Sequence, residues 1–299
     1  MLTSSTPTAR PRIAPLGILF VLITSVAWGL NWPSTKYLIS ELPPLPARGL
    51  AGLIGGAALG IYAWLRGDSL VIPQDQRIRL LVSAFLNVTM WMAVMGFALL
   101  WLPASEASVI AYTMPVWTAL LAWPLLGERL VPVRLIALVL AFTGLVILFS
   151  GEGVDASIAK WPGVALALLG AIAFALGTIF LKRYPLRLPG ATSAAWQLVL
   201  GCLPVAIAGF ALDQPSFANL SPLGWACMAY MTFVGLSIAY MTWFAALERL
   251  PASVAAIGTM LVPVIGVVAS AIALNEPLGL VQIAALALTL GGVALAARS

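Results

Sequence analysis

The sequence contains no histidine, and this absence removes several kinds of chemistry at once. Without His the chain lacks the usual zinc ligand, the base of a Ser-His-Asp triad and the imidazole pH switch. Charged residues are also scarce, at 8% of 299 residues against about 25% in soluble domains. Because 62% of the residues are hydrophobic, a water-soluble fold is not expected.

Other functional signals are missing as well. Cys202 and Cys227 lie within apolar runs and are typical of small buried hydrophobic residues, not of a disulfide or metal site. The formal charge of +5 is spread over short segments, so it forms no basic face for nucleic acid. No G-x-x-x-x-G-K-[ST] phosphate loop is present. We therefore expect no enzyme activity, no cofactor, no metal and no nucleic-acid partner.

The chain does contain long apolar runs, each near the length of about 20 residues that a membrane helix needs. The run from Ile13 to Tyr37 exceeds a signal-peptide core and lacks an A-x-A-like cleavage site, so we interpret it as a first span. The sequence predicts an all-α integral membrane protein with ten transmembrane helices. Their expected ranges are 15–36, 46–65, 79–101, 104–126, 132–150, 161–181, 191–212, 223–247, 252–274 and 279–297.

Basic residues are distributed unevenly between the two predicted sides of the membrane. Three of them, Lys36, Arg48 and Lys160, fall on one side. The other side receives twelve: Arg10, Arg12, Arg66, Arg77, Arg79, Arg129, Arg134, Lys182, Arg183, Arg187, Arg249 and Arg298. Because basic flanks resist translocation, this bias predicts that both termini are cytoplasmic. We expect the protein in a bacterial inner membrane.

An internal repeat divides the chain into halves at 1–150 and 151–299. A shift of 148 positions places 103–130 on 251–278 with nine identities in 28 positions, including both prolines and Glu128 on Glu276. Five spans per half start the second half on the opposite side of the membrane. The halves are therefore predicted to be inverted around a central cavity, an arrangement that supports alternating access.

A proline-alanine turn, a mid-helix proline and a glutamate after that helix occur once in each half. This pattern resembles the EamA-type repeat of the drug/metabolite transporter (DMT) superfamily, and within it the sequence looks like YddG-type exporters of aromatic and other neutral amino acids. The resemblance implies that four helices of each half surround the cavity, with 132–150 and 279–297 at the periphery. One departure is that Val254 stands where the first half has Glu106.

Glu106 is the carboxylate that lies clearly within a predicted span, and it is our candidate proton or ion site. The alternative is structural, because a Glu in a first helical turn meets the positive end of the helix dipole. We favour this structural interpretation. For Glu128 and Glu276 we likewise favour hydrogen bonding at helix ends over a role in transport.

Polar and aromatic side chains at helical spacing provide candidates for the cavity lining. Asn87 and Trp91 are four residues apart and share a helix face, which suits a neutral amino acid. Pro115 and Pro263 free backbone carbonyls for a cavity or simply kink packed helices, and both interpretations remain open. The full candidate set is Asn31, Asn87, Trp91, Ser108, Tyr112, Pro115, Trp196, Gln197, Ser237, Tyr240, Trp243 and Pro263.

Trp and Lys are also the usual residues of membrane interfaces, and for Trp32 and Lys36 we favour anchoring at the interface over substrate contact. The glycine-rich stretch that starts at Gly49 predicts close helix packing.

The predicted function is secondary transport that exports small neutral solutes, foremost amino acids including aromatic ones, by alternating access. Alternatives are an exporter of drugs or of another metabolite, and a passive channel. The sequence offers few catalytic residues for an intramembrane enzyme, since there is neither His nor an obvious carboxylate pair. The partners expected are a small-molecule substrate and the lipid bilayer. The oligomeric state stays open, and a monomer is compatible with the sequence.

Overall fold

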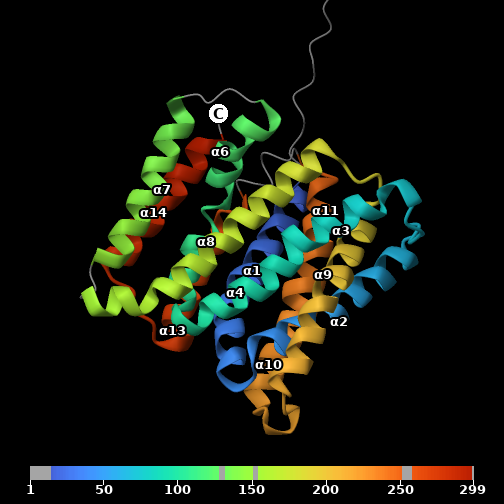
Figure 1. The fold of residues 1–299 in the computed structure, drawn as a ribbon, viewed down its shortest axis with the longest axis horizontal. Helices are drawn as coiled ribbons and strands as arrows, with labels where there is room; N and C mark the ends of the chain where they lie inside the picture. The colour runs from blue at the N-terminus through green and yellow to red at the C-terminus, as the bar shows by residue number, and fades with distance from the viewer. Residues whose placement is uncertain (1–14, 128–131, 151–153, 251–257, 298–299) are drawn as a thin grey trace, which may run out of the picture.

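The computed structural model describes residues 15–127, 132–150, 154–250 and 258–297, and this part of the chain is helical without strands (Figure 1). Seven of its helical segments are long and apolar enough to cross a membrane. These segments are Pro15–Glu41, Pro44–Leu65, Gln74–Trp101, Ala104–Leu126, Ile158–Arg183, Gly190–Asp213 and Pro222–Leu247. The predicted all-α membrane fold is confirmed, while the count of ten helices stays a prediction.

The first half of the chain comprises α1 (Pro15–Glu41), α2 (Pro44–Leu65), η1 (Gln74–Gln76), α3 (Arg77–Ala84), η2 (Phe85–Thr89), α4 (Met90–Trp101), α5 (Ala104–Ala111), α6 (Met114–Leu126) and α7 (Pro132–Ser150). The second half comprises α8 (Val154–Arg183), α9 (Gly190–Asp213), η3 (Phe217–Asn219), α10 (Pro222–Ala229), η4 (Tyr230–Ile238), α11 (Ala239–Leu247), α13 (Leu261–Leu274) and α14 (Leu280–Ala297).

The predicted helix boundary at Leu102-Pro103 is present, since α4 ends at Trp101 and α5 begins at Ala104. A proline at this point favours a new first turn, because it has no N–H to leave unsatisfied. The second boundary of this kind, at Leu250-Pro251, extends beyond the described residues.

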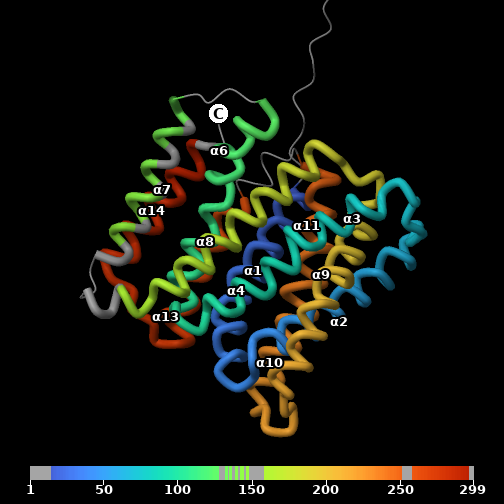
Figure 2. Tube along the Cα trace, in the orientation of Figure 1, coloured from blue at the N-terminus to red at the C-terminus, as the bar shows by residue number. Residues whose placement is uncertain are grey.

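Helices of the first half pack against helices of the second half in a repeating pattern. Helix α2 packs along α9, and α7 packs along α14 at one edge of the molecule (Figures 1 and 2). Helix α1 contacts α13 and α11, while α8 contacts α6 and α4. Each contact of α1 with the second half thus has a counterpart contact of α8 with the first half.

Two π-helical segments interrupt the helices that border the centre of the bundle. The shift of 148 positions carries η2 onto 233–237, which lies within η4. A π-helical turn widens the helix and exposes backbone groups, and such turns are frequent at functional sites. The irregular backbone therefore occurs at matching places in the two halves.

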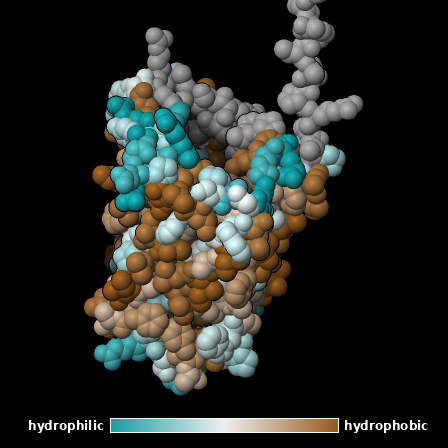
Figure 3. All heavy atoms as spheres, turned by 90° about the vertical axis from the view of Figure 1, so that its right-hand side faces the viewer, coloured by the Kyte–Doolittle hydropathy of each residue, from teal (hydrophilic) through white to brown (hydrophobic). Residues whose placement is uncertain are grey.

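The surface is apolar where a bilayer would surround it. Figure 3 shows a hydrophobic band with hydrophilic groups toward both ends of the visible face. Ile61, Leu212 and Ile272 are 59%, 75% and 77% exposed, whereas Thr24 and Ser25 are fully buried. Because lipid solvates apolar side chains, this arrangement is stable only in a membrane.

Small residues bring α2 and α9 together, as the glycine-rich stretch predicts. A Cβ atom at Gly49 would lie 2.5 Å from the backbone nitrogen of Ala206, and one at Gly52 would overlap Cys202. Without side chains at these positions the two backbones approach closely, which is the principal way that membrane helices gain packing energy.

We expect Gly49→Ala to destabilise the protein by about 1–3 kcal/mol, because the added methyl group overpacks a rigid backbone contact. Gly60→Ala on the same helix is the matched control, since its Cβ atom would meet only Ala195 Cβ at 3.8 Å. Thermal unfolding in detergent micelles measures both variants. Equal melting temperatures for the two variants would contradict close packing at Gly49.

Candidate functional site

A cavity of about 140 Å³ lies between the two halves of the bundle. Its walls come from α1, α2, η2, α4, α6 and the turn at Tyr112 of the first half and from α8, α9, η4 and α11 of the second half. This volume holds roughly ten water-sized groups, which is the size of a small amino acid. The cavity is therefore shared between the two halves, while their inverted arrangement stays a prediction.

Aromatic rings form much of the cavity wall. Trp28 contacts Tyr240 edge to face, with ring centroids 5.6 Å apart, and Trp91 contacts Phe174 at the same centroid distance. The indole N–H of Trp28 donates a hydrogen bond to the carbonyl oxygen of Gly235 in η4 at 3.1 Å. These contacts fix the rings across the boundary between the halves, because each pair joins the two repeats.

Polar groups in the wall are few, and they come from the first half. Asn31 and Thr35 lie on α1, Arg48 lies on α2, and Asn87 lies in the π-helical segment η2. Asn31 packs against Gly235 and Asn87 packs against Gly177, so each amide sits where the facing helix has no side chain.

Five of the predicted cavity residues lie in the cavity wall: Asn31, Asn87, Trp91, Tyr112 and Tyr240. What they share is a position on a helix face that points to the other half. Sequence reasoning missed Thr35, Arg48 and Phe174, together with the methionines Met92, Met95, Met114 and Met231. Arg48 carried a signal, because a charge in a predicted span without a nearby carboxylate needs an explanation.

The remaining candidates lie outside this wall. Three of them, Ser108, Ser237 and Trp196, form hydrogen bonds with other parts of the protein. Ser108 donates to the carbonyl of Ser105 in its own helix, and Ser237 donates to the carbonyl of Thr232. The Trp196 indole N–H donates to Leu70 O at 3.0 Å, away from the cavity. Hydroxyl groups that satisfy their own helix are no longer directed toward a substrate.

Gln197 and Trp243 each contact a residue of the cavity wall without lining the cavity. The side chain of Gln197 accepts a 3.5 Å hydrogen bond from Asn87 and donates to Ser193, while Trp243 packs against Trp28 with ring centroids 5.9 Å apart. Both therefore position residues of the wall without lining it.

The two prolines mark breaks between helices and not kinks within a single helix. Pro115 lies in the first turn of α6, which begins after α5 has ended at Ala111. Pro263 lies buried in the first turn of α13. Neither proline lines the cavity.

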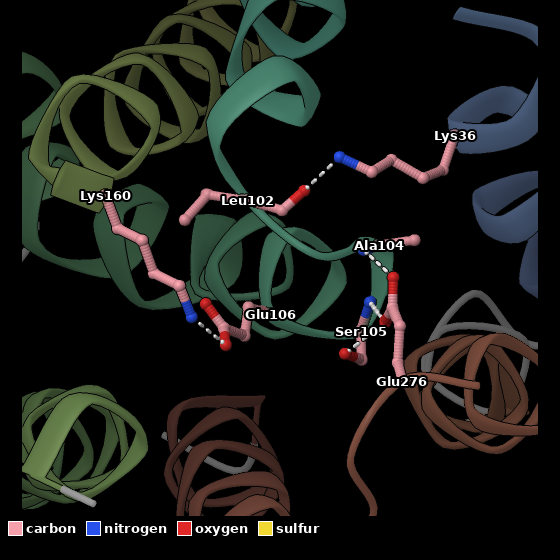
Figure 4. Close-up of polar contacts among 7 residues, drawn as sticks. All are labelled: Lys36, Leu102, Ala104, Ser105, Glu106, Lys160 and Glu276. Atoms are coloured by element: carbon pink, nitrogen blue, oxygen red, sulfur yellow. Dashed lines mark hydrogen bonds and ion pairs between the residues drawn. The ribbon is translucent and has the colours of Figure 1, made fainter. Parts of the chain in front are cut away.

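The interface role favoured for Trp32 and Lys36 is wrong. Trp32 is 8% exposed and lines the cavity. The Lys36 ammonium donates to the backbone carbonyl of Leu99 and to that of Leu102, of which Figure 4 shows the second. A lysine that satisfies helix-end carbonyls does not need to reach the headgroups.

A charge cluster, comprising Lys36, Glu106, Lys160 and Glu276, closes one end of the bundle. The Glu276 carboxylate accepts hydrogen bonds from the N–H groups of Ala104 and Ser105 at 2.7 and 2.9 Å (Figure 4). These are donors that the start of α5 leaves unsatisfied. The prediction that Glu276 acts at a helix end is confirmed, and Glu128 lies outside the described residues.

Glu106 points to the other side of the same helix end. Its carboxylate is 2% exposed and lies 2.7 Å from the Lys160 ammonium of α8 (Figure 4). The structural interpretation of Glu106, a contact with the positive end of the helix dipole, did not include this partner, which comes from the other half. Within the described residues no group of His, Cys, Asp and Glu could hold a metal ion.

A second hollow lies between α1, η4 and α13, and its wall is almost wholly apolar, for example Leu30, Ile265 and Ile272. It contains no charged side chain. The polar cavity between the halves is therefore the candidate site for a solute.

The sequence profile of the EamA-like transporter family matches residues 15–150 and 161–298, which correspond to the two halves. The chain belongs to the EamA-like transporter family. This EamA-like transporter is 33% identical to the uncharacterized transporter YvbV of Bacillus subtilis over 278 residues, 93% of this chain and 90% of that protein. The "Probable amino-acid metabolite efflux pump" of Escherichia coli is 26% identical over 271 residues, 88% of each chain.

A solved crystal structure has the same fold, with a TM-score of 0.65 and 24% identity over 93% of this chain and 96% of that chain. The EamA-like transporter therefore combines a transporter family fold with a cavity between its halves and a charge cluster at one end.

We expect Glu106→Gln to destabilise the transporter by about 3 kcal/mol, because it removes the carboxylate that pairs with the largely buried Lys160 ammonium. The double variant Glu106→Gln with Lys160→Met should recover part of this loss, since no unpaired charge remains. Glu248→Gln is the control. Its carboxylate pairs with Arg66 at a side-chain exposure of 48%, and such pairs contribute about 0–1 kcal/mol.

Thermal unfolding of the four proteins in one detergent measures these differences. A double variant that is less stable than Glu106→Gln alone would show that the two residues do not act as a pair.

Proposed function

We propose that this chain is a secondary transporter that exports small neutral solutes, foremost amino acids including aromatic ones, by alternating access. The observation that carries the proposal is the cavity between the halves, where four polar side chains meet a wall of aromatic rings and methionines. Such a wall accepts apolar side chains of different shapes, while the few polar groups hold a common backbone.

The packing pattern supports alternating access. Two halves that meet through matching contacts, α1 with α13 and α11, α8 with α6 and α4, can exchange conformations around the cavity between them. The bias of basic residues favours cytoplasmic termini and thus places the charge cluster on the outer side. In this arrangement the cluster seals the outer end while solute enters from the cytoplasm of a bacterial cell.

The cavity chemistry and the names of two relatives support this substrate class. The proteins named "Probable amino-acid metabolite efflux pump" in Escherichia coli and Salmonella typhimurium are each 26% identical to this chain. Within the described residues the cavity wall has one charged side chain, so it suits a solute without a large net charge.

We expect purified protein in liposomes to catalyse saturable uptake of labelled phenylalanine or leucine. Trp91→Ala should lower Vmax/KM by about tenfold, because the indole is part of the cavity wall and contacts Trp32 and Phe174. The matched control is Trp123→Ala, which removes a tryptophan that is 56% exposed on the bilayer side. Absence of saturable flux for every amino acid tested would refute the amino-acid proposal.

The same liposomes separate the alternative functions. Uphill accumulation under an imposed proton gradient would argue against a passive channel. Drug efflux that amino acids do not compete with would favour a drug exporter. Proton-driven flux that survives Glu106→Gln would remove Glu106 as the proton site.

A further inference from the structure

Arg48 is a charged side chain in the interior of the protein. It lies on α2, is 5% exposed and lines the cavity between the halves. Its stem crosses Gly96 of α4, where a Cβ atom would lie 2.8 Å from Arg48 Cδ. The glycine makes room for the arginine, so the guanidinium is directed inward along α4 and away from the end of the bundle.

The guanidinium is only partly satisfied by the protein. Nε donates to the backbone carbonyl of Met92 at 2.8 Å, and Nη2 lies 3.4 Å from the Met92 sulfur. A guanidinium has five N–H donors, so donors remain for a ligand. Within the described chain no Asp or Glu forms an ion pair with Arg48.

A buried positive charge without a counter-ion is unfavourable by several kcal/mol, and a purely structural role does not need the charge. The Met92 contacts use one backbone acceptor and one weak sulfur acceptor, which an uncharged amide would also satisfy. In membrane proteins a buried ionisable residue beside a cavity marks a binding function by default.

The cavity wall also contains two acceptors that lack donors, although their oxygen atoms pack against Gly235 and Gly177 and do not face the cavity. The Oδ1 atoms of Asn31 and Asn87 are buried and make no hydrogen bond within the described residues. Both residues line the same cavity as Arg48. An unsatisfied buried carbonyl oxygen is costly unless a ligand supplies the N–H group.

We propose that Arg48 binds the carboxylate of a zwitterionic α-amino acid, and that the Asn31 and Asn87 amides turn into the cavity to accept hydrogen bonds from its ammonium group. This proposal rests on the proposed function and names the groups that recognise its substrate. A bidentate guanidinium-carboxylate contact supplies the missing negative charge, and the amide oxygens bind a cation without adding charge to the wall. The amino-acid side chain then lies among the aromatic rings and methionines.

Matched ligands test the proposal on the intact protein in detergent, by isothermal titration calorimetry. With L-leucine, the analogues are 3-methylbutylamine, which lacks the carboxylate, and 4-methylpentanoate, which lacks the ammonium group. L-phenylalanine with phenethylamine and 3-phenylpropanoate provides the second series. We expect the wild-type protein to bind the amine at least about 30-fold more weakly than the amino acid.

Single substitutions then test which protein side chain binds each group of the ligand. Arg48→Gln should weaken amino-acid binding by about 30-fold or more and leave amine binding unchanged. Asn31→Leu and Asn87→Leu should weaken amino-acid binding by about 3- to 10-fold and leave binding of the carboxylate analogue unchanged. Arg66→Gln, a change at an exposed arginine, is the control and should behave as wild type.

The outcomes separate the two proposals. If an amino acid binds and is transported, but the amine binds equally well or Arg48→Gln weakens both ligands alike, Arg48 does not recognise the carboxylate. If neither amino acid binds the wild-type protein, the proposed amino-acid transport is itself refuted, whatever the role of Arg48. Should Arg48→Gln not fold, the wild-type comparison of amino acid with amine still decides, and Arg48→Lys keeps the charge while removing the guanidinium fork.

Discussion

The fold depends on how the protein satisfies a pair of helix ends at Leu102-Pro103. The turn leaves carbonyl groups at the end of α4 and N–H groups at the start of α5 without helical partners, and lipid offers none. Lys36 of α1 donates to the carbonyls, and Glu276 of the second half accepts from the N–H groups. One turn thus joins three distant parts of the chain, and the closed end of the cavity follows from this junction.

The architecture could be predicted from the sequence because the bilayer allows so few solutions. Long apolar runs leave little freedom for any fold other than a helical bundle, while the five spans per half stay a prediction. The same constraints do not say which way a side chain points. Trp32 and Lys36 have the composition of an interface and were assigned there, yet both lie inward, because partners on α4 and in the second half are absent from any local pattern.

The types of residue at the candidate site could be predicted from the sequence, but only some of the individual residues could. Asn31, Asn87 and Trp91 were found because polar and large aromatic groups on one helix face are rare in an apolar chain. Ser108 and Ser237 were not distinguishable from them, since only the structure shows that their hydroxyl groups bond within their own helices. Arg48 was counted only among the basic residues at one side of the membrane, whereas Gly96 on a different helix provides the space that lets it point inward.

The repeat also limits how symmetrical the transport cycle can be. Glu106 pairs with Lys160 at the end that Glu276 closes, and the equivalent position in the second half is Val254. An apolar side chain cannot form an ion pair, so position 254 supplies no carboxylate that would match Glu106. Because breaking a largely buried ion pair exposes or strands two charges, opening the end with Glu106 requires a step that the other end does not share. Under the proposed alternating access, the two conformations would then differ in free energy, and the Glu106–Lys160 pair would contribute to that difference.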